Sequence, residues 1–253
     1  MGTVPATKRK GINIVSWSMR TKPPRVAQGV KLDGAGFYGP LCDPGIYTVK
    51  ITKADKVISG EIVLIPDPKS PHSLADRNLR KENVNELFVL SEDLAFMNQQ
   101  LLALKEQCAN SKEKCSNTDL KKKLDKFNKE LEEARAQLVA TKGGEAITGE
   151  EKIRERLSEL YGSVNGYEGR PSDSQLDKKA AVQADLMKNK ATMKNLWDKN
   201  LSTLNTALKK EGLPELSVLQ RTDFDNSGNT SFKSGAAGGN NLYKNFNSYL
   251  FFF

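Results

Sequence analysis

A short segment near the C-terminal end has the side-chain types that bind a hard cation. Asp223, Asp225 and Ser227 place oxygen atoms at alternate positions and Gly228 follows, as in the first half of an EF-hand-type calcium loop. The last position of such a loop needs a bidentate glutamate, but Ser234 stands there. A turn rich in Asp and Asn uses the same residue types. A weak calcium loop and a plain turn both remain open, and we predict no metal site.

Other residues suited to catalysis are scarce or poorly placed. His72 is the single histidine and follows Pro71 in a proline-rich connection, which is a poor position for a catalytic triad. The glycine-rich stretch 162–171 lacks the Gly-Lys-Ser/Thr sequence of a phosphate-binding loop. Cys108 and Cys115 flank a predicted turn and either form a disulfide or remain free thiols. We therefore predict no catalytic, cofactor-binding or metal-ligating residue, no cofactor and no enzymatic activity.

Positive charge is concentrated near the start of the chain. The formal net charge is +8 at pH 7, and the first thirty residues contain basic side chains but no acidic ones. Such a cluster attracts nucleic acid or anionic surfaces, or it protects a strand edge from unwanted pairing. No aromatic platform or reading helix accompanies it, so we predict no nucleic-acid binding. No run is long enough to span a membrane, and residues 1–10 lack the apolar core of a signal peptide.

Residues 39–65 predict a β-hairpin. Pro44 and Gly45 form a turn, the next residues alternate between apolar and polar, and a second strand over 57–65 follows the turn 53–56. Residues 11–20 predict a third strand, and 21–45 carry at most one more. We expect Trp17, Tyr47 and Ile51 to form the sheet core. Three to four strands are part of an immunoglobulin-like sheet, because a complete sandwich needs about seven strands.

Beyond three closely spaced prolines at 66–71, the sequence predicts helices. Apolar residues recur three and four positions apart in the predicted helices, which cover 74–109, 118–141, 149–163 and 172–211. The candidate N-caps are Ser73 or Asp76, Asn117 or Thr118, and Ser172 or Asp173. Gly143 and Gly144 are the predicted C-terminal stop of the second helix. The predicted bundle core contains Leu94, Leu101, Phe127, Leu131, Leu186 and Trp197.

The fold class is therefore α+β and mainly α, in three parts. A partial immunoglobulin-like β domain covers 1–66, an antiparallel up-and-down helical bundle covers 67–216, and an Asn/Ser/Gly-rich tail covers 217–253. We expect the tail to be flexible because few of its residues can enter a core.

Three motifs carry a resemblance to a known family. The first runs from Gly11 through Asn13 and Trp17 to Arg20, and the second joins Gly39-Pro40 to Pro44-Gly45-Ile46-Tyr47. The third is the stretch 161–172, Tyr-Gly-Ser-Val-Asn-Gly-Tyr-Glu-Gly-Arg-Pro-Ser. Together they resemble the C-terminal region of secreted bacterial sortilin-like proteins, which are also labelled glycosyl hydrolase or neuraminidase-repeat proteins. The resemblance implies an extracytoplasmic location and a β-propeller built from Asp-box repeats. Residues 223–232 do not match the Asp-box order.

Three hypotheses for the function follow. The first is a non-catalytic accessory module that braces the propeller or docks a partner. The second is a part of a carbohydrate-active or glycan-binding protein, for which Trp17 and Tyr167 are the candidate aromatic contacts. The third is a coiled-coil scaffold that oligomerises through the apolar seam of residues 87–138. We favour the first, because no catalytic constellation is evident in the sequence.

Overall fold

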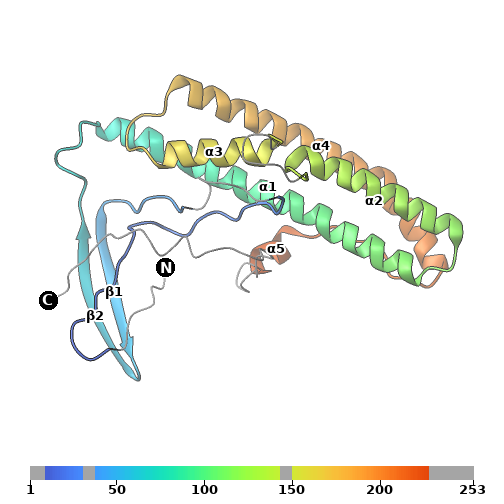
Figure 1. Cartoon of the computed structure of the whole chain (residues 1–253), viewed down its shortest axis with the longest axis horizontal. Coiled ribbons are helices and arrows are strands. Elements are labelled where there is room, and N and C mark those ends of the chain that lie inside the picture. Colours follow the sequence, from blue (N-terminus) through green and yellow to red (C-terminus); the bar gives the residue numbers. More distant parts are fainter. Residues whose placement is uncertain (1–8, 31–37, 143–149, 228–253) are drawn as a thin grey trace.

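The computed structural model describes residues 9–30, 38–142 and 150–227. Figure 1 shows an elongated helical body with a two-stranded hairpin projecting from one end. The described part is therefore mainly helical with one small antiparallel sheet, in agreement with the predicted fold class at this coarse level. No helix within these ranges is long and apolar enough to cross a membrane.

The body is a helical bundle with three rows. Its four helices are α1 (Leu74–Lys114), α2 (Thr118–Leu138), α3 (Ile153–Asn165) and α4 (Asp173–Lys210). α2 and α3 lie end to end and run antiparallel to both long helices (Figure 1). Each of them packs against α1 and against α4, and α1 also contacts α4. The predicted bundle is thus present, but its second row is broken, because the connection from α2 to α3 does not reverse the chain.

Side-chain caps fix most of the helix starts. The N-caps of α1, α2 and α4 are Ser73, Asn117 and Ser172. Ser73 Oγ accepts a hydrogen bond from Asp76 N at 3.1 Å, and the Asp76 carboxylate accepts one from Ser73 N, which completes a capping box.

The predicted glycine stop of the second helix is wrong. α2 ends at Leu138 because Val139 is extended, and residues 143–149 lie outside the described part.

One apolar core runs through all three rows. Five of the six predicted bundle-core side chains are buried, namely Leu94, Leu101, Phe127, Leu131 and Leu186. Trp197 is half-buried and packs against the rim of this core. The apolar stripes of α1 and α2 face each other inside the bundle, so the seam of residues 87–138 is not a free surface for a coiled coil between chains.

The sheet consists of β1 (Gly45–Lys53) and β2 (Lys56–Leu64). The register pairs Gly45 with Leu64 and Lys53 with Lys56, so the turn has two residues, Ala54 and Asp55. The predicted hairpin is therefore present. The predicted count of three to four strands and the immunoglobulin-like sheet are not confirmed, since the described residues contain two strands in one sheet.

The predicted strand over residues 11–20 is wrong. This segment is extended but makes a single β-bridge, between Arg20 and Leu41. Met19 adopts a left-handed backbone conformation (φ 54°), which interrupts an extended run, and Pro23 and Pro24 beyond it have no N–H to donate to a ladder. The alternation of residue types in 11–20 is therefore not sufficient to place this segment in a sheet.

The chain segment that follows α4 is held against α1. The Gln107 side chain donates to Ser217 O at 3.0 Å and accepts from Ser217 N at 2.8 Å, and Leu216 beside it is buried. The chain then forms the short helix α5 (Arg221–Ser227). Residues 217–227, which belong to the predicted tail, lie against the bundle, with Val218 and Leu219 partly buried and Phe224 buried. Residues 228–253 lie outside the described part.

Candidate functional site

One face of the hairpin is apolar except at its turn, and the rest of the molecule covers it only in part. The opposite face mixes polar and charged side chains with the exposed Ile46, Val57 and Val63. The register places Tyr47, Val49, Ile51, Ile58, Ile62 and Leu64 on the same side, which we call the apolar face. Near the bundle, the Trp17 ring packs against Tyr47 with ring centroids 5.3 Å apart. Toward the turn, Ile51 is 50% exposed and Ile58 is 66% exposed. Ile51 was predicted to be a core residue, and this prediction is wrong because half of its surface is exposed.

Both long edges of the hairpin are also open. Within the described ranges the sheet has two strands, and the backbone hydrogen bonds outside regular elements involve neither β1 nor β2. Each strand therefore presents a row of unpaired N–H and C=O groups along one side. Two-stranded hairpins are marginally stable in water, and three or more strands or a packing partner are needed for independent stability. The hairpin thus has the properties of a surface that a partner completes.

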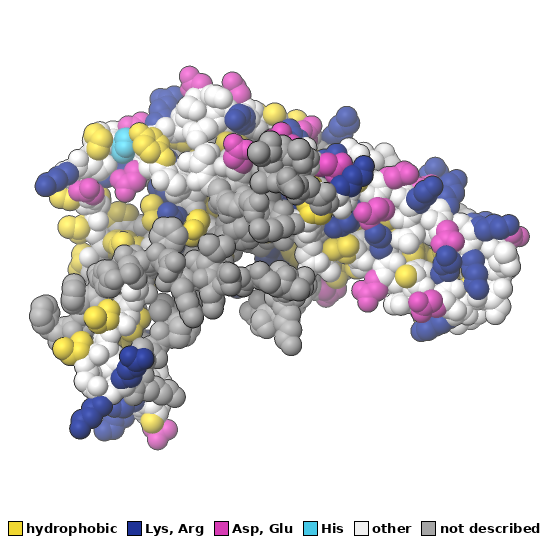
Figure 2. All heavy atoms as spheres, in the orientation of Figure 1, with side chains coloured by type: hydrophobic (Ala, Val, Ile, Leu, Met, Phe, Trp, Pro, Cys, Tyr) yellow, Lys and Arg dark blue, Asp and Glu magenta, His cyan; other side chains and the backbone are white. Residues whose placement is uncertain are grey.

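Lysines gather at the turn end of the hairpin. Lys50, Lys53 and Lys56 are exposed there, with Asp55 between the last two. Figure 2 shows basic side chains at this tip and apolar side chains along the hairpin above it. The surface therefore combines an apolar strip with a positive end, a combination suited to protein docking rather than to bond cleavage.

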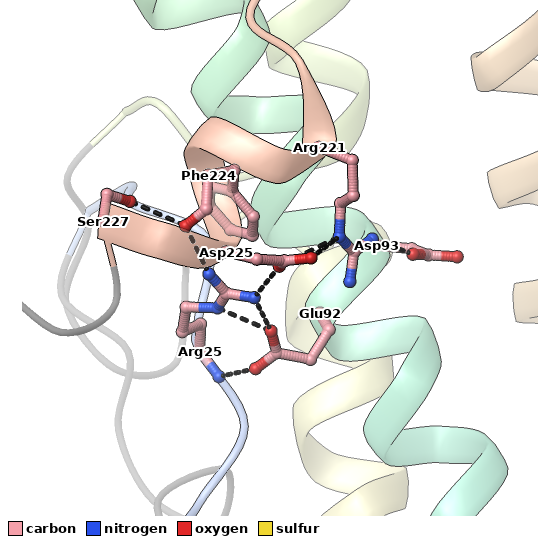
Figure 3. A network of polar contacts seen from close by, with 7 residues as sticks. All are labelled: Arg25, Glu92, Asp93, Arg221, Phe224, Asp225 and Ser227. Carbon is pink, nitrogen blue, oxygen red and sulfur yellow. Dashed lines mark hydrogen bonds and ion pairs between the residues drawn. The ribbon is translucent and has the colours of Figure 1, made fainter.

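A network of polar side chains fastens the chain segments that precede and follow the bundle. We call it the Arg25 clasp, and its members are Arg25, Glu92, Asp93, Arg221, Phe224 and Asp225 (Figure 3). Arg25 donates from its main-chain N and from Nε to the Glu92 carboxylate at 2.5 Å each. Its two terminal nitrogens donate to Phe224 O at 2.8 Å and to Asp225 Oδ1 at 2.7 Å. One side chain thereby links the N-terminal segment, α1 and α5.

Aromatic contacts and a second arginine complete the clasp. The Arg25 guanidinium lies 3.8 Å from the centroid of the Phe224 ring, and Phe96 packs against that ring at 5.3 Å. Arg221 donates to Asp93 at 2.6 Å and also to Asp225. The hydrogen bond from Arg25, followed by that from Arg221, lowers the pKa of Asp225. Every carboxylate here is paired with an arginine and no nucleophile is present, so the clasp is suited to holding segments together.

Arg154 makes a similar connection where the second row of the bundle is interrupted. Its buried guanidinium donates to Ala27 O at 3.2 Å and to Val30 O at 2.9 Å, and Val30 N donates to Ala140 O at 3.1 Å. A side chain on Gly29 would collide with Arg154, which accounts for the glycine at this position. The N-terminal segment therefore fills the gap between α2 and α3.

The residues singled out for chemistry in the sequence do not converge on one site. Asp223, Asp225 and Ser227 belong to α5 instead of a calcium loop, while Gly228 and Ser234 lie outside the described part. No group of three or more potential metal ligands occurs among the described residues. Cys108 and Cys115 are buried free thiols, and Cys42 is a half-buried free thiol. Burial raises the pKa of the Cys108 thiol to about 12.

The candidate glycan contacts lie in separate places. Tyr167 is 57% exposed, and the edge of its ring meets His72 with centroids 5.1 Å apart. The two rings line a shallow depression together with Asp67 and Glu168, and the absence of a side chain on Gly169 lets both rings approach its backbone. Trp17 is half-buried against Tyr47 instead. The two predicted aromatics therefore do not form one binding face.

Sequence reasoning missed the Arg25 clasp. Arg25 was counted as part of a solvated basic cluster, and Phe224 was assigned to a flexible tail. The one available signal was the pair of apolar residues Leu216 and Phe224, which are both buried.

Compared with known proteins, the chain matches no family model, no curated protein and no solved structure.

Proposed function

We propose that this chain is a non-catalytic accessory module of an extracytoplasmic sortilin-like β-propeller protein. In this proposal the hairpin docks through its apolar face on a β-structured surface, and the bundle braces that surface as a rigid support. The family assignment rests on the three sequence motifs described above. The docking role rests on the structure of the hairpin.

The observation that carries the docking role is the exposed distal half of the apolar face. A strand pair with alternating apolar side chains is typical of a sheet that packs against another layer. Complete burial of an isoleucine side chain contributes about 2 kcal/mol, so covering Ile51 and Ile58 supports a specific contact. The bundle core is closed without these residues, which leaves them available for a partner.

A binding experiment with a matched control tests this function. The purified chain is titrated against an immobilised sortilin-like propeller protein, with Ile58→Lys as the test variant and Thr52→Lys as the control. Both positions are exposed and near the turn, but they lie on opposite faces of the hairpin. We expect Ile58→Lys to weaken binding by about tenfold or more, equivalent to about 1.4 kcal/mol, and Thr52→Lys to bind like the unmodified chain. Equal binding by both variants, or no binding at all, would contradict the proposal.

The non-catalytic part of the proposal has its own assay. The chain is incubated with aryl glycosides and with a sialoside, and the released product is measured. We expect no turnover above that of buffer, because Asp67 and Glu168 are the two carboxylates among the described residues that share a depression, and it is shallow and does not enclose a substrate between them. Turnover that survives repeated purification would disprove it.

Glycan binding is the second candidate, and the exposed Tyr167 ring favours it. An aromatic ring beside the Asp67 and Glu168 carboxylates offers a stacking surface and hydrogen-bond acceptors for a sugar. A glycan array screened with the chain and with Tyr167→Ala distinguishes this function. A sugar bound by the chain and lost in the variant would support it, and an array without specific signal would remove it.

A further inference from the structure

We propose that the outer edge of β2 pairs with the same edge of a second copy of this chain, forming a continuous four-stranded antiparallel sheet. This inference concerns the edge of the hairpin and does not rest on the function proposed for its apolar face.

The register identifies which backbone groups of β2 are free. In a hairpin with a two-residue turn, the pair flanking the turn is hydrogen-bonded, and bonded and non-bonded pairs then alternate. Lys53 and Lys56 flank this turn, so Ile58, Gly60 and Ile62 bond to β1. The N–H and C=O groups of Val57, Ser59, Glu61 and Val63 consequently point away from β1, and no described residue pairs with them.

An antiparallel pairing of two β2 strands about Gly60 satisfies these groups symmetrically. Ser59 then lies opposite Glu61 of the second copy, and Val57 lies opposite Val63. These pairs form about eight backbone hydrogen bonds between the copies. A two-fold axis through Gly60 keeps both apolar faces on the same side of the new sheet, so Ile58 meets Ile62 of the second copy.

Gly60 supplies an independent observation. It stands in the middle of a strand, where glycine weakens the local structure. Its φ is not in the left-handed region, and a Cβ added there would meet no atom within 4 Å. Nothing in the described chain therefore requires glycine at this position. The close approach of a second backbone at the symmetry axis provides a reason, because glycine inside a strand often marks such a contact.

The charges favour the β2 edge over the β1 edge. Lys50 projects near the middle of β1, and lysine on an edge strand is a common guard against pairing. β2 has no lysine between its ends, and in the proposed pairing its one charged side chain there, Glu61, faces the neutral Ser59 of the second copy. Lys56 faces Leu64 of the second copy. No two like charges lie directly opposite each other. The hairpin projects from one end of the bundle, so the helices do not cover this edge (Figure 1). The contact joins two short edge strands, so we expect a weak dimer that is measured by varying the chain concentration.

Proline substitution tests which edge pairs. Ser59→Pro removes an outward N–H from β2, and Thr48→Pro removes one from β1, while neither residue bonds to the other strand of the hairpin. Molar masses are measured by analytical ultracentrifugation over a range of micromolar concentrations. We expect the unmodified chain and Thr48→Pro to form concentration-dependent dimers and Ser59→Pro to remain a monomer. A monomeric unmodified chain would overturn the proposal, as would a dimer lost through Thr48→Pro alone or a series of larger oligomers.

Disulfide trapping tests the register even if a proline variant folds poorly. In a non-bonded antiparallel pair the two Cα atoms lie about 4.5 Å apart, which a disulfide can span. In a Cys42→Ser background, Gly60→Cys should give a covalent dimer under mild oxidation. Val49→Cys is the matched control, since Val49 pairs with Gly60 across the hairpin, and it should stay monomeric. Equal cross-linking of both variants, or none of Gly60→Cys, would refute pairing about Gly60.

Discussion

Replacement of Arg25 by alanine should release α5 and the N-terminal segment from α1 together. The substitution removes hydrogen bonds to Glu92, to Phe224 O and to Asp225, along with the guanidinium that covers the Phe224 ring. It also leaves the Glu92 carboxylate, whose side chain is 12% exposed, without its cationic partner, although the main-chain N–H of residue 25 can still donate to it.

The expected loss in the free energy of unfolding follows from these contacts. A hydrogen bond to a charged group contributes about 1.5–3 kcal/mol, and a cation–π contact with partial exposure adds about 0.5–1 kcal/mol. The Asp225 contact is largely solvent-exposed and contributes little. The dominant cost is the mostly buried Glu92 charge, so we expect a loss of about 3 kcal/mol. For a chain of this size that corresponds to a melting temperature lower by about 6–12 °C.

Urea unfolding followed by circular dichroism measures the loss, and hydrogen exchange locates it. Lys112→Ala is the matched control, because Lys112 forms an exposed ion pair with Asp125. Such a pair contributes about 0–1 kcal/mol. Amides of α5 should lose protection in Arg25→Ala and keep it in the control. A loss below about 1 kcal/mol with unchanged protection of α5 would refute the view that the clasp holds these segments.

Three further predictions concern the core, pH and thiol reactivity. Leu101 is 0% exposed, so Leu101→Ala should lower the free energy of unfolding by about 3 kcal/mol. Urea titration measures this loss, and a loss under about 1 kcal/mol would place Leu101 outside the core. The hydrogen bond from Arg25 lowers the pKa of Asp225. The stability that this hydrogen bond contributes is therefore present above pH 3.8, the ordinary pKa of the carboxyl group, and is lost as the pH falls through the lowered pKa. Because this exposed contact contributes little, protonation of Asp225 should reduce the exchange protection of α5 only slightly and only below pH 3.8, and a decline near neutrality would contradict this. The buried Cys108 thiol, with its raised pKa, should react with iodoacetamide only when the chain unfolds, while Cys42 reacts earlier; mass spectrometry of digests shows the order.

The helices could be predicted from sequence because their signals are local. The spacing of apolar residues such as Leu94 and Leu101 specifies the buried face, and Ser73 and Ser172 cap their helices through residues three positions away. These interactions require no knowledge of distant segments. The break between α2 and α3 could not be predicted in the same way, because Arg154 and residues 27–30 fill it from over a hundred positions apart.

The hairpin could be predicted as an element but not as a surface. Alternation over 45–64 identifies a strand pair with one apolar face, but it does not reveal what covers that face. Ile51 was therefore placed in a core although half of its surface is exposed. The Arg25 clasp was missed for a related reason, since its charged residues match the pattern of solvated side chains until Phe224 brings them together.

If the bundle folds by itself and the apolar face of the hairpin lies outside its core, a charge at Ile58 should leave the stability of the chain unchanged. The most direct measurement is the free energy of unfolding of the Ile58→Lys variant, obtained by urea titration at a concentration where the chain is monomeric. We expect a value within about 0.5 kcal/mol of the unmodified chain, because exposed positions tolerate substitution. A loss of about 2 kcal/mol or more would show that Ile58 is part of the folded core, and would contradict a docking surface outside that core.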